Sequence, residues 1–302
     1  MSDGPLAGTW YVLPTPFADD GSVDEGSVRR LVDAAISWGV DGLTAMGVTS
    51  EAAHLDRDER SAALRAILEV AAGRVDVVVG CSAPSPAEVV GLMEEAAGPG
   101  ARAAMVAAPP GSAPDSLPAF YRDLAGSSLD VVVQDEPAAT GVAVPIEILL
   151  PCVDAAAAVA VKLEDPPTPV KIARLLELRP TLAVFGGLGG AFALSELRRG
   201  AQGTMTGFAF PEILAAVRQA VRAGDPRRAG RIFDRYLPLI AFEAQPGVGL
   251  AVRKELLRRR GVLSTALLRT GAELDPETAA ELDEVLGGVG IVPSSEPFAV
   301  PD

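Results

Sequence analysis

The chain is poor in the residues that form disulfides, bind metals or carry positive charge. Its two cysteines, Cys81 and Cys152, are too few for a disulfide framework and stand in apolar contexts, so we expect buried thiols in a reducing, cytoplasmic compartment. A single histidine and no close cysteine pair predict no metal cluster. The net charge of −14 argues against a nucleic-acid partner, because phosphate binding requires a basic surface. No apolar run reaches the ~20 residues of a membrane span, and the N-terminus lacks a signal-peptide pattern, so neither a membrane partner nor a targeting segment is expected.

Lysine is also scarce, and its scarcity draws attention to one position. Of the 26 lysines and arginines, three are lysines: Lys162, Lys171 and Lys254. Lys162 directly follows the apolar run Ala-Val-Ala-Val. A desolvated lysine can lose its proton, whereas arginine cannot, and the neutral amine attacks carbonyl carbon. The ordinary alternative is a strand-end lysine whose ammonium reaches water along its alkyl stem.

Short apolar segments recur along the chain and alternate with segments of helical period. Their length and lack of polar alternation are typical of strands covered on both faces. The expected strands are residues 8–13, 42–46, 75–79, 103–107, 131–133, 159–161, 182–185 and 203–207. Strand–helix repeats of this number predict a closed (β/α)₈ TIM barrel. The alternative, an open doubly wound sheet, would usually show a glycine fingerprint after its first strand, and the sequence has none there.

The pattern after about residue 226 is helical only. Helices are predicted over residues 229–242, 248–260 and 276–286. Asp275 and Pro276 suit the N-cap and first position of the last one. We therefore expect residues 1–225 to form the barrel and residues 226–302 to form a C-terminal helical extension packed on it. Its proline-rich tail, residues 291–302, is expected to be extended or disordered.

The ends of the predicted strands carry the candidate site. Reactive residues of such barrels stand at the C-terminal ends of strands. Lys162 ends the sixth predicted strand, and Glu164, two residues later, should share its face. Residues 47–51, 134–137 and 186–190 follow three other strands. The sequence therefore predicts that these segments converge on one pocket at the mouth of the barrel.

Several short motifs, in their order and spacing, resemble the dihydrodipicolinate synthase / N-acetylneuraminate lyase family of class I aldolases. They are Thr15-Pro16-Phe17, residues 39–51 with Leu55 and Glu59-Arg60, Pro137 with Thr140-Gly141, Val161-Lys162, and residues 200–203. The resemblance runs from Gly8 to about Leu286. It implies a TIM barrel, an imine between lysine and a 2-oxo acid such as pyruvate, no cofactor, and a homo-oligomer, either a dimer or a tetramer.

The resemblance also assigns roles to single residues. Lys162 matches the imine-forming lysine, and Thr49 matches the second threonine of the family's Gly-Thr-Thr-Gly-Glu loop. The backbone N–H groups of Thr49 and Ser50 would then hold the substrate carboxylate, a role that suits donors at a strand-to-helix turn. The alternative is an ordinary turn with Ser50 as N-cap. Gly187, among other glycines, is expected to leave room for the substrate.

The chain departs from the family pattern at the proton relay. Val48 replaces the first threonine of the loop, Gln134 replaces the acid/base tyrosine, Ala139 replaces a substrate-binding arginine, and residues 109–111 replace a tyrosine pair. The amine is therefore kept while the usual relay is absent. Dihydrodipicolinate synthase activity is not expected from such a chain.

Proton transfer must then come from another group within reach of the reacting atoms. Glu164 is the first candidate, and Glu136, two residues beyond Gln134, is the second. Gln134 can orient a carbonyl or hydroxyl but cannot titrate. Glu164 has an alternative role as a mere ion-pair partner of the lysine. His54 fits an ordinary helix histidine better than a catalyst, and Cys81 ends the third strand without a partner that would favour its thiolate.

These residues lead to three hypotheses about function. The first is a carbon–carbon lyase that acts through Lys162 on pyruvate or another short 2-oxo acid. The second is a hydro-lyase or deaminase acting on a sugar acid or related 2-oxo acid, with which the missing tyrosine is compatible. The third is a non-catalytic protein that binds a small oxo acid. Retention of Lys162 and the carboxylate loop favours the enzymes, and loss of the relay favours the third hypothesis.

Overall fold

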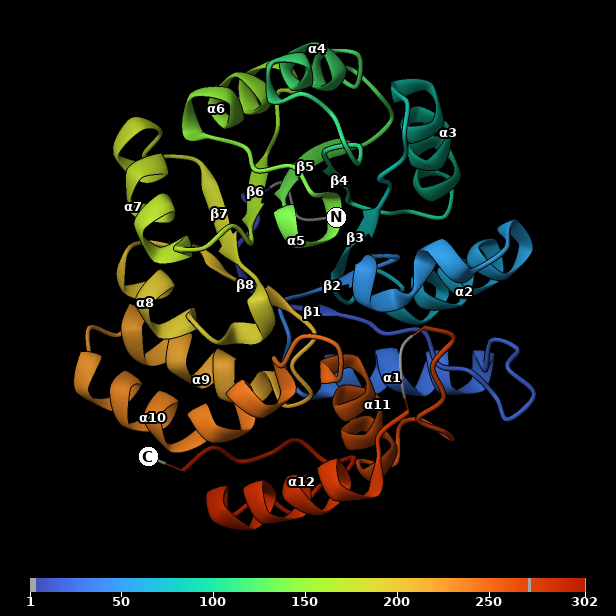
Figure 1. Ribbon diagram of the computed structural model, residues 1–302, viewed down its shortest axis with the longest axis vertical. Coiled ribbons are helices and arrows are strands. Elements are labelled where there is room, and N and C mark those ends of the chain that lie inside the picture. Colours follow the sequence, from blue (N-terminus) through green and yellow to red (C-terminus); the bar gives the residue numbers. More distant parts are fainter. Residues whose placement is uncertain (1–3, 271–272, 302) are drawn as a thin grey trace.

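Eight parallel strands, adjacent in sequence order, close into a barrel at the centre of the computed structural model (Figure 1). The strands are β1 (Gly8–Val12), β2 (Gly42–Ala45), β3 (Asp76–Gly80), β4 (Ala103–Ala107), β5 (Asp130–Asp135), β6 (Ala160–Leu163), β7 (Ala183–Gly186) and β8 (Gly203–Thr206). The TIM barrel is thus confirmed, and the open sheet is excluded. The structure describes residues 4–270 and 273–301, so the first residues of the N-terminal segment and Asp302 of the predicted tail lie outside it.

Helices and short turns connect the strands, and most of the helices cover the outer face of the barrel (Figure 1). The helices are α1 (Glu25–Ser37), α2 (Arg57–Ala71), α3 (Pro86–Ala97), α4 (Leu117–Arg122), α5 (Pro137–Thr140), α6 (Ile146–Ala155), α7 (Thr168–Leu178), α8 (Ala193–Arg198) and α9 (Pro211–Arg222). Short 3₁₀ turns are η1 (Val48–Ser50), η2 (Ala52–His54), η3 (Pro114–Ser116) and η4 (Leu188–Gly190). Capping boxes start two of the helices, Asp56 with Glu59 at α2 and Ser85 with Glu88 at α3. Within the described residues, no helix is both long and apolar enough to span a membrane.

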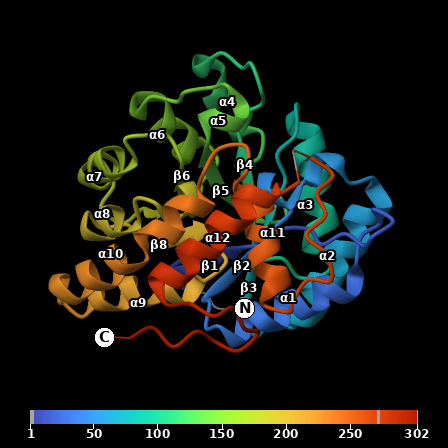
Figure 2. The same cartoon turned by 60° about the horizontal axis from the view of Figure 1, so that its bottom comes forward.

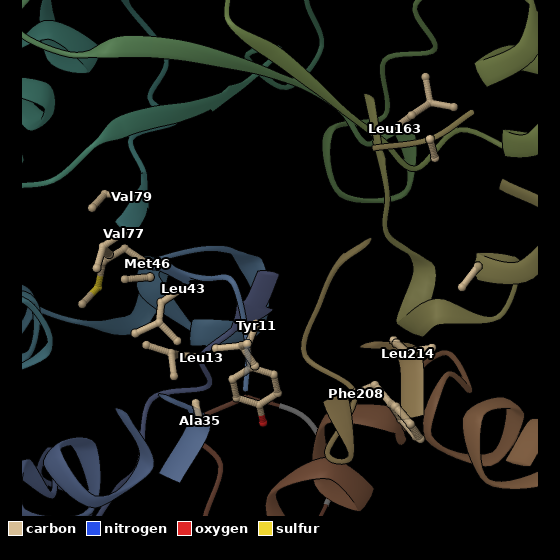
Figure 3. Packing of buried hydrophobic residues seen from close by; sticks show 14 of the residues in the cluster. Tyr11, Leu13, Ala35, Leu43, Met46, Val77, Val79, Leu163, Phe208 and Leu214 are labelled. Carbon is tan, nitrogen blue, oxygen red and sulfur yellow. The ribbon is translucent and has the colours of Figure 1, made fainter. Parts of the chain in front are cut away.

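Alternation along the strands creates two apolar cores, one inside the barrel and one around it. The inner core contains Trp10, Val132, Ala160, Phe185 and Met205. Residues of the opposite parity pack outward under the helices, as Figure 3 shows for Leu43 and Leu13 near Ala35 of α1. Leu163 belongs to this outer core. Its neighbour Lys162 therefore faces the barrel interior.

Three further helices form the C-terminal part: α10 (Pro226–Glu243), α11 (Gly249–Arg259) and α12 (Pro276–Val289). They confirm the helices predicted there, and Asp275 caps α12 by accepting hydrogen bonds from two backbone N–H groups of its first turn. Figures 1 and 2 show these helices beside α9 and α1, on one side of the barrel. The division of the chain at residue 225 stays a prediction.

The tail after α12 is extended, and buried side chains hold its backbone. Arg260 lies under the Trp38 ring, 3.6 Å from its centroid. Its guanidinium donates to the carbonyl oxygens of Ser294 at 3.0 Å and Glu296 at 3.3 Å. Of the two predictions for the tail, extended or disordered, the structure therefore supports an extended chain over residues 291–301.

Candidate active site

Lys162 and Gln134 stand side by side at the mouth of the barrel. Lys162 is the third residue of β6 and pairs in register with Gln134 of β5. Strand β6 continues to Leu163, two residues beyond the predicted end, so Lys162 lies inside the strand. Both residues are buried, with 6% and 4% of their surfaces exposed. The sheet therefore brings together an amine and an amide that lie 28 residues apart in the chain.

The Glu164 carboxylate connects these two side chains. Lys162 Nζ lies 2.9 Å from Glu164 Oε2. Gln134 Nε2 donates to the same oxygen at 2.9 Å and to Glu136 Oε2 at 2.6 Å. The other oxygen of Glu164 accepts the backbone N–H of Leu188 at 3.2 Å. The structure thus brings Lys162, Glu164, Gln134 and Glu136 into one array, while their catalytic and binding roles remain predictions.

Glu136 has unusual electrostatics for a carboxyl group. Burial, and then the charge of Glu164, raise the pKa of Glu136 to about 7, and Lys162 opposes this rise. A carboxyl with such a pKa is shared between its acid and base forms at neutral pH. The array therefore offers an amine, a carboxylate and a carboxyl group that exchanges its proton near neutrality.

Glycines at the end of β7 make room for two carboxyl groups. A Cβ atom on Gly187 would meet Glu164 Oε1 at 2.1 Å, and one on Gly186 would meet Glu196 Oε2 at 1.7 Å. Gly187 therefore accommodates the Glu164 side chain. The predicted contact of Gly187 with substrate remains a prediction.

Glu196 of α8 is a buried carboxyl group that sequence reasoning missed. Thr168 Oγ1 donates to its Oε1, while its Oε2 has no hydrogen-bond partner within residues 4–270 and 273–301. Burial raises the pKa of Glu196 to about 7; the Thr168 hydrogen bond opposes the rise and Glu164 adds to it. Its sequence context, Ser-Glu-Leu-Arg, is typical of a solvated helix face and did not indicate a buried carboxyl group.

The turn of residues 47–51 follows β2. Ser50 is buried, its hydroxyl donates to the Leu13 carbonyl at 2.5 Å, and its N–H donates to the Gly47 carbonyl at 3.0 Å. Thr49 Oγ1 is also buried and has no hydrogen-bond partner among the described residues. Because the Ser50 N–H is already bonded, the predicted carboxylate site rests first on Thr49. Both assignments remain predictions.

Glu51 ties this turn to the C-terminal part of the chain. Its Oε1 accepts from Lys254 Nζ at 2.5 Å, and its Oε2 accepts the backbone N–H groups of Arg269 at 2.8 Å and Thr270 at 2.9 Å. Glu51 has φ of 54°, a left-handed conformation that costs a non-glycine residue ~1–2 kcal/mol. These bonds offset that cost and hold the turn. Sequence reasoning named Glu51 and Lys254 but did not connect them.

A cavity of about 690 Å³ adjoins the array. Gln134 and Glu136 belong to its lining, as do His54, Arg60 and Thr270. Lys162 and Glu164 are not among the lining residues; Glu164 lies behind the wall and is connected to it by the hydrogen bond from Gln134. The cavity lies along the ends of β2 to β5, so the predicted convergence of the strand ends holds for one side of the mouth.

Neither a tyrosine nor Cys81 supplies a proton donor to this cavity. All three tyrosines lie among the described residues, and none lines it. Tyr11 and Tyr236 are fully buried, and the Tyr121 hydroxyl donates to the Val106 carbonyl at 2.9 Å. Burial raises the pKa of the Cys81 thiol to about 12, which excludes a thiolate there at neutral pH. Across residues 4–270 and 273–301, no group of three or more His, Cys, Asp or Glu side chains is arranged to hold a metal ion.

Comparisons with known proteins place this chain in a family. Residues 5–289 match the model of the dihydrodipicolinate synthetase family. The chain is 34% identical over 286 residues to an L-2-keto-3-deoxyarabonate dehydratase of Azospirillum brasilense, an alignment that covers 91% of this chain and 92% of the relative. It is 32% identical over 298 residues to a 4-hydroxy-tetrahydrodipicolinate synthase of Acidobacterium capsulatum, covering 95% and 97% of the two chains.

The fold agrees with these matches. A solved structure of dihydrodipicolinate synthase from Rhodopseudomonas palustris has a TM-score of 0.89 and 36% sequence identity, over 94% of this chain and 97% of that one. Both the family model and the relatives span nearly the whole chain, including the strand that carries Lys162. The chain therefore belongs to the dihydrodipicolinate synthetase family, and it is a lyase.

Proposed function

We propose that this lyase forms an imine between Lys162 and a short 2-oxo acid, and that it removes water from a 3-deoxy-2-oxo sugar acid. The observation that carries the proposal is the array of Lys162, Glu164, Gln134 and Glu136. It combines a nucleophile with two carboxyl groups and lacks a tyrosine. A hydro-lyase was the second hypothesis from the sequence, and the chemistry of this array raises it above carbon–carbon cleavage.

Dehydration through an imine needs a nucleophile, a base and an acid, and the array contains a group for each. The Lys162 amine adds to the C2 carbonyl, and loss of water gives the imine. A base, which we assign to the Glu164 carboxylate, removes a C3 proton and leaves an enamine. The enamine expels the C4 hydroxyl as the C4–O bond breaks, and Glu136 protonates it to water. Hydrolysis of the unsaturated imine frees Lys162, so the net change is the loss of one water.

The protonation state of the group beside the C4 hydroxyl separates dehydration from carbon–carbon cleavage. Cleavage between C3 and C4 requires a base that removes the hydroxyl proton, whereas dehydration requires an acid that protonates the leaving oxygen. Because burial raises the pKa of Glu136 to about 7, both of its forms are present at neutral pH, and the acid that dehydration requires is therefore available. The relative from Azospirillum brasilense, named a dehydratase of a keto-deoxy acid, supports the same choice.

A carbon–carbon lyase is the second candidate, favoured by relatives such as the synthase of Acidobacterium capsulatum. Formation of dihydrodipicolinate precursors is not expected, since Val48, Gly111, Gln134 and Ala139 stand where the relay and the arginine would be. Losing a general acid or base costs about 10²–10⁴ in rate. An assay with pyruvate and aspartate semialdehyde should therefore give little or no product. Turnover comparable to that of the synthases would contradict our reading of these positions.

The test of the proposed reaction compares two products from the same substrates. A panel of 3-deoxy-2-oxo sugar acids is incubated with the enzyme, and mass spectrometry follows loss of one water while a coupled assay follows pyruvate. We expect the dehydrated product from at least one substrate, with little pyruvate. Pyruvate as the main product would favour the carbon–carbon lyase instead.

Variants then assign the proton transfer. Glu164→Gln should permit some imine formation but slow turnover by about tenfold or more, because the amide cannot accept the C3 proton. Glu94→Gln, an exposed glutamate on α3, is the matched control and should behave like the wild type. Undiminished turnover of Glu164→Gln would contradict the assignment of Glu164 as the base, and Glu136 would be the next residue to test.

We also propose that the enzyme is a homo-oligomer, either a dimer or a tetramer, as the resemblance implies. Exposed apolar side chains, including Val48, Val170 and Phe192 at 59%, 56% and 43% exposure, are consistent with contacts between copies. Light scattering coupled to gel filtration would measure the mass in solution, and a monomer at micromolar concentration would contradict this part of the proposal.

A further inference from the structure

Arg60 on α2 is a half-buried arginine that forms no ion pair in the described part of the chain. Its Nη2 donates to the carbonyl oxygen of Gly80, the last residue of β3, at 2.8 Å. No ion pair joins Arg60 to any carboxylate among residues 4–270 and 273–301. Its neighbours on α2 differ, because Arg57 pairs with Glu95 at 2.6 Å and Glu59 pairs with Arg269 at 2.5 Å. The remaining N–H donors of this half-buried guanidinium are free to bind an acceptor.

The unused donors of Arg60 belong to the wall of the active-site cavity. Arg60 is the one arginine or lysine among the described residues that line it. Two carboxyl groups also line the cavity, and neither balances Arg60: Glu51 is neutralised by Lys254, and Glu136 bonds to Gln134. Burial lowers the pKa of Arg60, and the opposing influence of Cys81 and of Glu95, which is already paired with Arg57, does not cancel this shift.

The strand order places Arg60 across the cavity from Gln134, the in-register neighbour of Lys162, which itself is not among the lining residues. Gly80 ends β3, and Gln134, the in-register partner of Lys162, lies on β5. Two strand spacings of ~4.8 Å separate these strands by about 10 Å. In Figure 1, α2 lies outside β2 and β3, far around the ring from β6. A ligand that is bonded to Lys162 at one end would therefore need several carbons to reach Arg60 at the other.

We infer that the cavity takes a 2-oxo acid with a second anionic group at its far end, and that Arg60 binds this group. The inference rests on the proposed imine at Lys162 and names the class of its substrate: dianionic 2-oxo acids, with a terminal carboxylate or phosphate. The planar guanidinium can donate two parallel hydrogen bonds to either group. Ala139, on the same cavity wall, leaves Arg60 as the source of positive charge there. The cavity volume of about 690 Å³ leaves space for a chain of this length.

The experiment compares matched pairs of 2-oxo acids by borohydride trapping of the imine, followed by intact mass. The monoanions 2-oxopentanoate and 2-oxohexanoate are set against the dianions 2-oxoglutarate and 2-oxoadipate, which have the same carbon numbers. A third arm uses 2-oxo-4-phosphonobutanoate and so separates phosphate recognition from carboxylate recognition. We expect at least one dianion to half-saturate trapping at a concentration about tenfold lower than its monoanion, the effect of one charge-assisted contact.

Variants on α2 connect this preference to Arg60. Arg60→Gln, which keeps a donor for the Gly80 carbonyl, should abolish the preference while leaving half-saturation by the monoanions within about twofold. Arg65→Gln is the matched control, since Arg65 is exposed on the same helix and the variant loses the same charge. Thermal unfolding of both variants checks that they are folded, and the wild-type comparison needs no variant.

The possible failures are distinguishable. If wild-type enzyme traps every monoanion as readily as its dianion, or if the preference survives in Arg60→Gln, the inference about Arg60 is wrong and the imine at Lys162 stands. If no 2-oxo acid gives an adduct, the proposed function itself fails. A preference limited to the phosphonate would keep the subsite and assign it to phosphorylated substrates.

Discussion

Lys162 and Lys254 are both buried lysines beside a glutamate, yet their surroundings differ in kind. Lys254 lies 2.5 Å from Glu51, and both side chains are at most 1% exposed. Lys254 Nζ also donates to the Leu267 carbonyl at 2.8 Å and lies over the Phe17 ring. Lys162 lies 2.9 Å from Glu164, with 7% and 9% of the two side chains exposed.

The partner glutamates show the difference more clearly. Glu51 receives hydrogen bonds from Lys254 and from the backbone N–H groups of Arg269 and Thr270, so both of its oxygens are occupied by fixed donors. Glu164 shares its Oε2 with Gln134, which leads to Glu136 and the cavity. A buried charge enclosed by fixed donors stabilises a loop, whereas one connected to a cavity through groups that titrate can take part in chemistry.

Removing the amine of Lys162 should have the largest effect. We expect Lys162→Ala to lose turnover by about 10⁴-fold or more, because a covalent nucleophile has no substitute in the array. Borohydride trapping with pyruvate should label the wild type on the peptide that contains Lys162 and leave the variant unlabelled. Label on Lys254 or Lys171 would contradict the conclusion that Lys162 differs from the other lysines in reactivity.

Removing the amine of Lys254 should affect stability more than chemistry. Lys254→Met leaves Glu51 charged and buried, so the free energy of unfolding should fall by about 3–5 kcal/mol. Lys162→Met should cost less, since Glu164 is more exposed than Glu51, at 9% against 1% of the side chain, and its charge is better screened by water. Urea unfolding of both variants measures the two losses, and equal losses would contradict the contrast between an enclosed pair and an open one.

The activity that depends on the Lys162–Glu164 pair should vary with pH because of Glu136. Because Glu136 has a pKa of about 7 and acts as the acid in the proposed step, kcat should fall as pH rises above about 7. Glu136→Gln should lower kcat by about tenfold to a hundredfold and remove this limb of the pH profile. A limb that persists in the variant would show that another group, with Glu196 as the next choice, titrates there.

Glu196 provides the smallest effect, on stability rather than rate. Its pKa is about 7 in the folded chain against 4.5 in an unfolded one, so between these pH values the folded state binds more protons. The free energy of unfolding therefore falls as pH rises through that window, by up to about 3 kcal/mol from this group. Glu196→Gln lacks this loss, so its stability relative to wild type should be higher at pH 8 than at pH 5. A difference that is the same at both pH values would contradict a raised pKa.

Local sequence patterns sufficed for much of the fold. Each of the eight strands begins and ends within two residues of its prediction, because strands covered on both faces are short uninterrupted apolar runs. The three C-terminal helices followed from helical period and from the cap at Asp275. Strand alternation also predicted that Glu164 would lie beside Lys162, and the two are 2.9 Å apart.

The sequence by itself determined that the chain forms a barrel, that Lys162 and Glu164 share a face and that no tyrosine stands at the family's acid/base position. Only the tertiary structure decided which polar groups lie together: Glu196 beneath Gly186, Arg60 on the cavity wall, and Lys254 against Glu51, 203 residues away. The physical reason is range. Strand and helix periods are set by neighbours a few residues apart, whereas the pKa of a carboxyl group and the partner of a buried cation are set by whichever distant segments the closed barrel brings into contact.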